Sequence, residues 1–168
     1  MAKKGNLILD ESQIQSKIKR IAYEIYEDNF KEKKLVVAGI EDRGYRVAQL
    51  LAKELVTISN IQVLLVKVSV DKKSIINSNI ELDCNPKLLK NKSIILVDDV
   101  LNTGKTLAYS LKPFLNLEIK KLVIAVLVNR SHILFPIMAT YTGYELSTTI
   151  NEHIDVYIEK SPKGVYLN

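Results

Sequence analysis

The chain has 168 residues, of which 47% are hydrophobic and 26% charged; this is the size and composition of one packed domain, over residues 1–168, and excludes a disordered protein. Its 24 basic and 19 acidic residues give a net charge of +5, which favours anionic ligands slightly without indicating a nucleic-acid-binding protein. Cys84 is the sole cysteine, which excludes an internal disulfide or a multi-cysteine zinc site and favours a cytoplasmic location.

The first part of the chain predicts two helices with one strand between them. The apolar triplet at residues 7–9 is too short for a signal-peptide core, and no stretch approaches the roughly 20 apolar residues that cross a bilayer, so we expect no membrane association. Asp10 and Gln13 form a capping-box pattern before a helix, whose apolar residues recur at Ile14, Ile18, Ile21, Ala22 and Ile25. Leu35 to Ile40 predicts a buried strand, followed by a charged loop and then a helix marked by Val47, Leu50, Leu51 and Leu55.

The middle of the chain continues the alternation of strands and helices. Residues 61–70 predict a second strand, and residues 71–92 are polar without a clear period. Ser93 to Val97 predicts a third strand, and Lys121 to Val128 a fourth. Between them lies a helix with one apolar face, formed by Leu107, Leu111, Phe114 and Leu115. Such alternation predicts an α/β fold, with a parallel sheet flanked by helices.

The C-terminal part has a different character. From Ile137 onward, short β-prone pieces are separated by turn signals, and they read ATYTGYEL, HIDVYIE and KGVYLN. We therefore expect a small antiparallel β-rich hood or edge at the C-terminus.

One segment carries most of the chemical signal. After the apolar run of the third strand come two adjacent carboxylates, Asp98 and Asp99, at the sheet edge where ligands bind in open α/β folds. The next residues combine small side chains, hydroxyls and a glycine just before a helix, and they are Asn102, Thr103, Gly104, Lys105 and Thr106. Such a turn directs backbone N–H groups at a phosphate, while the acids suit a sugar diol or a magnesium ion.

Other nucleotide-binding motifs fit less well. Gly104-Lys105-Thr106 matches the end of a Walker A loop, but Asp99 stands where that motif needs its first glycine. The glycine pair Gly39 and Gly44 has Walker spacing but continues Tyr45-Arg46, and no strand-to-helix junction contains a GxGxxG fingerprint. A solvated strand end with a helix cap is the simpler alternative for the two aspartates.

The sequence VDDVLNTGKT resembles the phosphoribosyl-pyrophosphate (PRPP) motif of type I phosphoribosyltransferases. Within that superfamily, AVLVNRSHILFPIMATYTGYELST resembles PyrR-like proteins, in which we expect approximately VLVDRGHRELPIRADYVG at this place. PyrR-like proteins couple uracil phosphoribosyltransferase activity with regulation of the pyrimidine operon. The resemblance implies PRPP and a nucleobase as substrates, Mg²⁺ as cofactor, a role in pyrimidine salvage and a homodimer.

The resemblance also implies roles for individual residues. Asp98 and Asp99 correspond to the residues at the ribose hydroxyls, one of them near the reacting centre, and they are the candidates for a magnesium contact. The 5-phosphate would be held by Asn102, Thr103, Gly104, Lys105 and Thr106. The pyrophosphate loop would be Glu41, Asp42, Arg43 and Gly44, with backbone N–H groups exposed through a strained peptide; a salt bridge that caps this loop is the alternative role of Arg43. Asn129 and Arg130 lie in the base and pyrophosphate region.

The chain departs from the PyrR-like pattern at several positions. The segment Val70 to Cys84 corresponds to the mobile loop that closes over the site, but Ser69-Val70-Asp71-Lys72 replaces a Tyr-Arg-Asp-Asp type segment. Lys72 and Lys73 are candidates to reach the pyrophosphate or are simply solvated. Asn129 replaces an aspartate, Ser131 replaces a glycine and Ile133 replaces an arginine. For His132, a structural hydrogen bond is the favoured role.

Two functions follow from these observations. The first is transfer of a phosphoribosyl group from PRPP to uracil or another base, with apolar residues of 133–137 either against the base or in the core. The alternative is a non-catalytic PRPP- or nucleotide-binding regulator of pyrimidine genes that acts through RNA or protein. RNA binding has weak support, because the lysines at 31, 33 and 34, at 87, 90 and 92, and at 120 and 121 are scattered along the sequence without interleaved aromatic residues. The apolar residues of the N-terminal helix are one reason to expect the homodimer.

Overall fold

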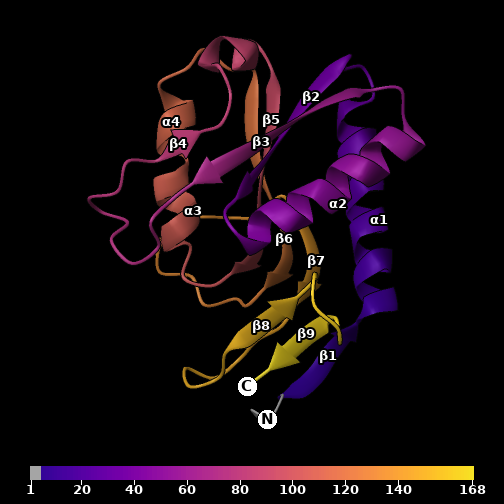
Figure 1. The fold of residues 1–168 in the computed structure, drawn as a ribbon, viewed down its shortest axis with the longest axis vertical. Coiled ribbons are helices and arrows are strands. Elements are labelled where there is room, and N and C mark those ends of the chain that lie inside the picture. The colour runs from indigo at the N-terminus through magenta and orange to yellow at the C-terminus, as the bar shows by residue number, and fades with distance from the viewer. Residues whose placement is uncertain (1–4) are drawn as a thin grey trace.

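A six-stranded sheet forms the centre of the computed structural model, which describes residues 5–168 (Figure 1). Its strands are parallel except β4, which pairs antiparallel with β3. In spatial order they are β4 (Glu81–Leu82), β3 (Gln62–Ser69), β2 (Lys34–Ile40), β5 (Ser93–Leu101), β6 (Lys121–Asn129) and β7 (Tyr141–Glu145). The predicted parallel sheet is confirmed.

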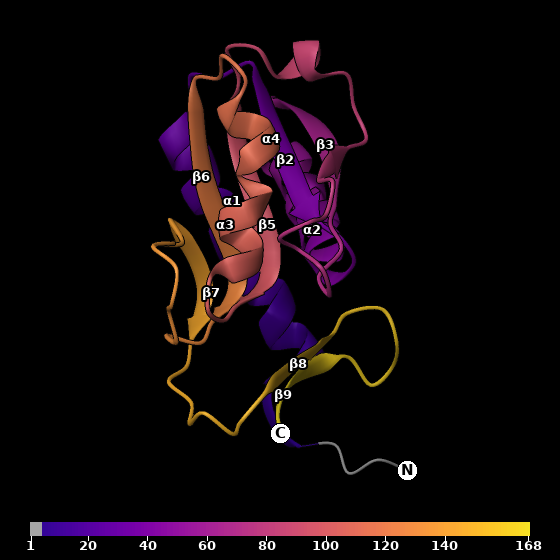
Figure 2. The same ribbon diagram turned by 90° about the vertical axis from the view of Figure 1, so that its left-hand side faces the viewer.

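Helices cover both faces of this sheet (Figures 1 and 2). One face carries α1 (Glu11–Asn29) and α2 (Arg43–Ile58), and the other carries α3 (Lys105–Ser110) and α4 (Lys112–Leu115). A 3₁₀ helix, Pro86–Leu89, precedes β5. Because side chains alternate along a strand, Leu35 and Val37 pack on the α1 side whereas Val36 and Ala38 pack on the α3 side. Burial on both faces explains why the middle of each central strand is a continuous apolar run.

The first helix begins where the capping box predicts. Asp10 Oδ1 accepts a hydrogen bond from the Gln13 N–H at 2.8 Å, and the Asp10 N–H donates to Gln13 Oε1 at 2.9 Å. The apolar residues of α1 are buried within the chain, in the core that it shares with α2 and the sheet. These residues are therefore not available for a dimer interface, contrary to one reason given for a homodimer.

The helix after Gly104 is broken, contrary to the prediction of one continuous helix. Pro113 has no N–H to donate to the preceding turn, and α3 and α4 are separated at Leu111. Phe114 is fully buried, but Leu115 is 69% exposed, so Leu115 does not belong to the predicted apolar face.

A second sheet of three antiparallel strands forms the hood at one end of the molecule (Figures 1 and 2). Its strands, in order, are β1 (Asn6–Asp10), β9 (Gly164–Leu167) and β8 (Ile154–Tyr157). The prediction of a C-terminal hood is confirmed for the last two β-prone pieces. Strand β1 was not predicted, and residues 1–4, the basic start of the segment considered as a signal peptide, lie outside the described residues.

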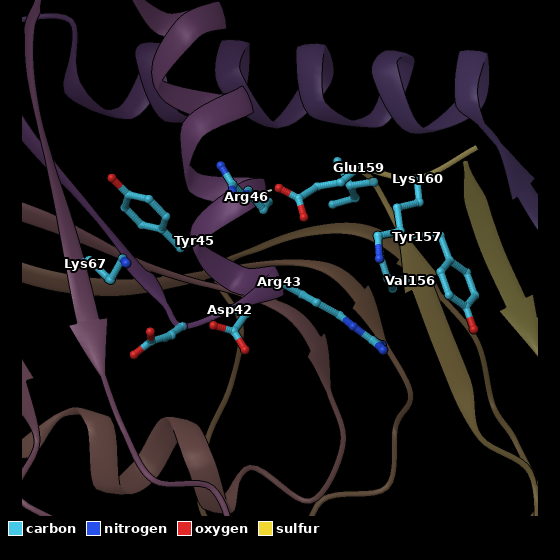
Figure 3. Close-up of a pocket in the computed structure, with 11 residues that line it drawn as sticks. Asp42, Arg43, Tyr45, Arg46, Lys67, Val156, Tyr157, Glu159 and Lys160 are labelled. Atoms are coloured by element: carbon cyan, nitrogen blue, oxygen red, sulfur yellow. Dashed lines mark ion pairs between the residues drawn. The ribbon is translucent and has the colours of Figure 1, made fainter. Parts of the chain in front are cut away.

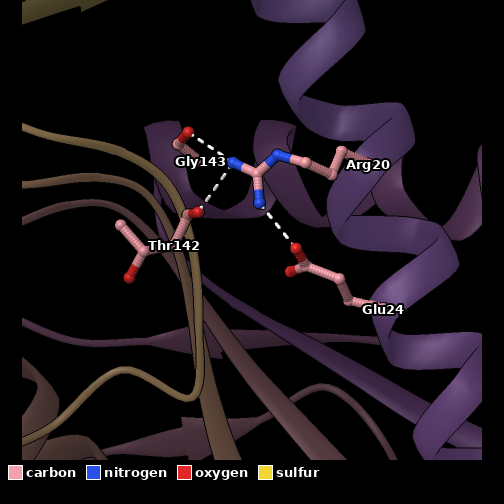
Figure 4. Close-up of polar contacts among 4 residues, drawn as sticks. All are labelled: Arg20, Glu24, Thr142 and Gly143. Carbon is pink, nitrogen blue, oxygen red and sulfur yellow. Dashed lines mark hydrogen bonds and ion pairs between the residues drawn. The ribbon is translucent and has the colours of Figure 1, made fainter.

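The first C-terminal β-prone piece joins the central sheet. It forms β7, which pairs parallel with β6 rather than antiparallel in the hood. Arg20 of α1 ties this strand to the helix, since its Nη2 donates to the carbonyls of Thr142 at 3.0 Å and Gly143 at 2.6 Å (Figure 4). Glu24 accepts a hydrogen bond from the same guanidinium at 2.6 Å.

Across residues 5–168, no helix has both the length and the apolar character needed to span a membrane.

Candidate functional site

A cavity of about 430 Å³ lies at the carboxyl ends of the central strands. It brings together the two aspartates, the loop after β5, the residue before α2 and the first residue of α2. The residues that line it are Asp42, Arg43, Lys72, Asp98 to Leu107 and Ile154. The residues that the sequence predicts for a ribose-phosphate ligand thus share one cavity.

The two aspartates are buried side chains on β5. Asp98 is 4% exposed and Asp99 7%, so the alternative of a solvated strand end is wrong. Asp98 Oδ1 accepts a hydrogen bond from the Asp99 N–H at 2.9 Å. Burial, and then the neighbouring Asp99 carboxylate, raise the pKa of Asp98 well above its usual value, while Lys72 acts in the opposite direction. A cation or a hydrogen-bond donor placed between these carboxylates would relieve their mutual repulsion.

The loop after β5 has a left-handed glycine at the start of α3. Gly104 has φ +83° and accepts a hydrogen bond from the Ala108 N–H at 2.9 Å. The Thr103 carbonyl accepts hydrogen bonds from the N–H groups of Leu134 at 2.9 Å and Phe135 at 3.0 Å. Because three backbone hydrogen bonds hold it, the loop has its shape without a ligand, which is the preorganisation that a phosphate site needs.

The loop before α2 approaches the aspartates closely. A Cβ atom on Gly44 would lie 2.6 Å from Asp98 Oδ1 and 2.9 Å from its Cα. Only glycine therefore allows the first turn of α2 to lie beside this carboxylate. The peptide bond between Glu41 and Asp42 is cis, and the Glu41 N–H donates to the Val68 carbonyl at 2.9 Å.

Arg43 extends from α2 towards the hood, along a second hollow of about 500 Å³ (Figure 3). Its Nη1 lies 3.5 Å from Asp155 Oδ1, and its guanidinium lies 5.8 Å from the centre of the Tyr157 ring. Arg46, one turn further on, pairs with Glu159. Arg43 thus forms a salt bridge with the hood and not one that caps its own loop, and both side chains of this pair are more than a third exposed. Such a pair is weak, and it leaves Arg43 able to exchange Asp155 for an anion.

The end of β6 and the residues that follow it as far as Ile137 lie outside the lining of the cavity. Asn129 Oδ1 accepts a hydrogen bond from the Ser131 N–H at 3.0 Å, and Arg130 is buried with its side chain in contact with Asn102. Of the apolar residues that follow, Ile137 is in the core, Phe135 packs edge-on against Tyr109, and Ile133 and Leu134 are 42% and 71% exposed.

Some features of the cavity could not be read from the sequence. Ile154 of β8 lines it, and no motif marks that residue. Of the two adjacent lysines, Lys72 lines the cavity and Lys73 does not.

Within residues 5–168 no cluster of three or more acidic, histidine or cysteine side chains could hold a metal alone. Two carboxylates do fit Mg²⁺, which usually binds to one or two protein carboxylates together with substrate phosphates and water.

A parallel sheet with helices on both faces, a β hood over the carboxyl edge of the strands, and an acidic pair followed by a phosphate-type loop define a type I phosphoribosyltransferase fold. The fold of a hypoxanthine-guanine phosphoribosyltransferase from Bacillus anthracis is similar, with a TM-score of 0.80 at 20% identity over 99% of both chains.

Sequence comparison gives the family. The model of the phosphoribosyl transferase domain matches residues 6–161. The Bifunctional protein PyrR of Leuconostoc mesenteroides is 32% identical over 159 residues, which cover 91% of each chain. That of Fusobacterium nucleatum is also 32% identical, over 95% of this chain and 94% of its own. The chain therefore belongs to the phosphoribosyltransferase family and is similar to PyrR proteins.

Proposed function

We propose that this chain transfers a phosphoribosyl group from PRPP to a nucleobase, giving a nucleoside monophosphate and pyrophosphate. The observation that carries this proposal is the buried pair Asp98 and Asp99 at one wall of a cavity that the loop 102–106 also lines. A ribose 5-phosphate has a diol that donates hydrogen bonds to carboxylates and a phosphate that accepts them from backbone N–H groups. This cavity provides both kinds of partner on neighbouring residues of one strand and loop.

The remaining walls suit the pyrophosphate of PRPP. Arg43, the first residue of α2, and Lys72, in the segment after β3, both line the cavity, and each offers a positive charge to the leaving group. We assign the loop Glu41 to Gly44 to the pyrophosphate and Asn102 to Thr106 to the 5-phosphate. The sugar would then lie between them, over Asp98 and Asp99.

Transfer breaks the bond between C1 of the ribose and the pyrophosphate oxygen, and a base nitrogen forms the new bond to C1. Positive charge develops on the ribose ring, and the carboxylates of Asp98 and Asp99 are placed to stabilise it. Arg43 and Lys72 stabilise the negative charge on the departing pyrophosphate, and closure of the segment 70–84 would exclude water. Mg²⁺, held by Asp98 and Asp99 together with PRPP, would supply further charge neutralisation when bound.

Uracil is the base that we propose first, because the similarity is to PyrR proteins. Ile154 offers an apolar surface on the hood side of the cavity, and the segment 129–137, which contains Asn129 and Arg130, lies next to the phosphate loop through the bonds of Thr103. Neither feature distinguishes a pyrimidine from a purine by charge.

Product formation tests the proposal. The protein is incubated with PRPP, MgCl₂ and one base at a time, from uracil, hypoxanthine, guanine and adenine, and nucleoside monophosphate is measured by chromatography. We expect product with uracil and none with Asp99→Asn. PRPP binding without product from any base would favour the non-catalytic regulator, and absence of PRPP binding would refute both.

A second function, RNA binding by a regulator, is favoured by one observation. The lysines that are scattered in the sequence gather at the amino ends of the parallel strands, opposite the cavity. Lys34 begins β2, Lys92 precedes β5, and Lys121 begins β6, and these strands are neighbours in register. We name the residues of 31–34, 87–92 and 118–121 the lysine edge.

The lysine edge accounts for the whole positive charge of the chain. It contains eight lysines and two glutamates, which leaves 16 of the 24 basic and 17 of the 19 acidic residues elsewhere. Both glutamates are paired, Glu32 with Lys120 and Glu118 with Lys90. Two hollows, of about 500 and 410 Å³, share Lys34 and Gln62, and one of them is lined by Tyr26 and by Phe30, which is 61% exposed. Amines beside an exposed aromatic ring suit a single strand of RNA.

Binding of a fluorescent single-stranded RNA, followed by anisotropy, tests this second function. We expect binding that weakens with salt, and about a tenfold loss of affinity when Lys34 and Lys92 are both changed to glutamate. The matched control changes Lys17 and Lys19 of α1 to glutamate, which alters net charge equally. Equal loss in both variants would show that only net charge attracts the RNA.

The homodimer and the cytoplasmic location belong to the same proposal. The dimer is proposed from the resemblance to type I phosphoribosyltransferases, and its interface must use residues other than the buried ones of α1. The cytoplasmic location is proposed from the single, unpaired Cys84.

A further inference from the structure

Arg130 is a buried cation whose guanidinium donates to four oxygen acceptors. The residue is 7% exposed. Nε donates to Thr148 Oγ1, Nη1 to Asn102 Oδ1 at 3.3 Å, and Nη2 to the carbonyls of Thr149 at 2.7 Å and Ile150 at 3.5 Å. Burial of an arginine costs free energy unless its N–H groups are paired. The hydrogen bonds of Arg130 offset that cost, and they connect segments of the chain that an apolar residue here would not connect.

One partner of Arg130 lines the cavity, and the others lie in the segment that leads to Ile154 on its hood side. Asn102 is the first residue of the phosphate loop. Thr148 and Thr149 lie in the segment between β7 and β8, and that segment leads to Ile154, which lines the cavity from the hood. The main chain strengthens the first connection, since the Arg130 N–H donates to the Leu101 carbonyl at 3.0 Å.

We infer that Arg130 is a positioning residue that fixes the phosphate loop against the hood and does not contact the pyrophosphate. The inference rests on the proposed function. Its three donating nitrogens are directed at protein oxygens, and the residue is absent from the lining of the cavity. Arg130 therefore acts on substrate through Asn102, and its loss affects the 5-phosphate end of the ligand.

Lysine cannot replace this arginine. A guanidinium presents donors from three nitrogens in a planar fork, whereas lysine presents one ammonium group. Arg130→Lys keeps the charge but cannot reach Thr148, Asn102 and Thr149 together. Thr148→Val removes one acceptor and leaves Arg130 and the phosphate loop unchanged in sequence, so it tests the same connection if Arg130→Lys fails to fold.

Arg20 provides a matched control. Its guanidinium also donates to two backbone carbonyls, those of Thr142 and Gly143, and to a side-chain oxygen of Glu24 (Figure 4). It belongs to α1, connects that helix to β7, and does not line the cavity. Arg20→Lys therefore removes similar hydrogen bonds at a place where their loss should lower stability without affecting ligand binding.

Calorimetric titration with ribose 5-phosphate and, separately, with magnesium pyrophosphate tests the inference. We expect Arg130→Lys to weaken ribose 5-phosphate binding about tenfold and Thr148→Val about threefold, with pyrophosphate binding unchanged. Arg20→Lys should lower Tm and leave both affinities unchanged. Two results would overturn the inference. One is weaker pyrophosphate binding in Arg130→Lys, and the other is unchanged ribose 5-phosphate binding in both Arg130→Lys and Thr148→Val. Failure of the unmodified protein to bind ribose 5-phosphate would instead refute the proposed function.

Discussion

Replacing Gly104 with alanine tests the geometry of the phosphate loop. Gly104 has φ +83°, a backbone conformation in which an L side chain costs about 1–2 kcal/mol. The added Cβ would also lie 3.1 Å from Ile137 Cβ and 3.3 Å from the Phe135 carbonyl oxygen. Ile137 is buried in the core, so it cannot move away without disturbing its neighbours. Both effects act against the loop conformation that we assign to phosphate binding.

The net magnitude follows from three contributions. Alanine reduces the conformational freedom of the unfolded chain, which stabilises the variant by about 0.4–1 kcal/mol. Strain of about 1–2 kcal/mol and crowding of about 1 kcal/mol oppose it. We therefore expect a net loss of about 1–2.5 kcal/mol for the phosphate-bound protein relative to the unfolded chain.

Urea unfolding with and without saturating ribose 5-phosphate measures this loss. If the alanine-containing loop leaves its left-handed shape when no ligand is bound, part of the strain is lost from the unfolding free energy and appears as weaker binding. With ligand the loop must adopt its bound shape, so the sum of the change in stability and the change in binding free energy equals the full loss. This sum is the quantity to compare with the expected net loss of about 1–2.5 kcal/mol.

Asn91→Ala is the matched control, because Asn91 has φ +56° and lies at the opposite end of the sheet, before β5. We expect lower stability and unchanged affinity for ribose 5-phosphate. If Gly104→Ala changes neither stability nor affinity, with a sum below about 0.5 kcal/mol, then the phosphate-bound loop does not contain a left-handed residue at position 104.

Three further predictions concern stability. Ser131 has φ +57°, so Ser131→Gly should raise the unfolding free energy in urea by about 0.5–1 kcal/mol; no gain would argue against this conformation. The raised pKa of Asp98 means that the native protein binds protons more tightly than the unfolded chain, so wild-type stability should fall as pH rises from about 3.8. Asp98→Asn should remove that decline in thermal unfolding, and parallel curves for the two proteins would contradict it. Asp10→Ala removes the helix cap and should lower the unfolding free energy in urea by about 1 kcal/mol. An unchanged unfolding free energy would show that the cap is absent in solution.

The elements that sequence reasoning found are those with a strong local signal. The central strands are continuous apolar runs because both faces of the sheet are covered, and α1 begins at a capping box that uses only Asp10 and Gln13. The residues of the candidate site could be predicted to lie together because the acidic pair and the glycine loop occupy one strand end and one turn, and they line one cavity. Burial of the aspartates follows from that same strand, which remains covered as far as Leu101.

The elements that were missed depend on residues far apart in the sequence. Strand β1 pairs with β9 at the other end of the chain, and its short apolar triplet has no period of its own. Strand β7 resembles the hood strands in composition, and only its pairing with β6 distinguishes it. The position of Ser131 where PyrR-like proteins have glycine was a visible departure, and its positive φ now explains the preference for glycine there.

The parallel sheet separates the two proposed functions in space. Because all its long strands run in one direction, their carboxyl ends meet at the cavity and their amino ends meet at the lysine edge. The cavity holds two buried acids, whereas the excess of positive charge lies at the far edge. An RNA attracted to the lysine edge would therefore not compete with PRPP for the same residues, and any effect of nucleotide on RNA binding must pass through the sheet or through a second subunit. Variants of Lys34 and Lys92 that lose RNA while retaining transfer, and an Asp99→Asn variant with the opposite behaviour, would show that one chain carries two independent sites.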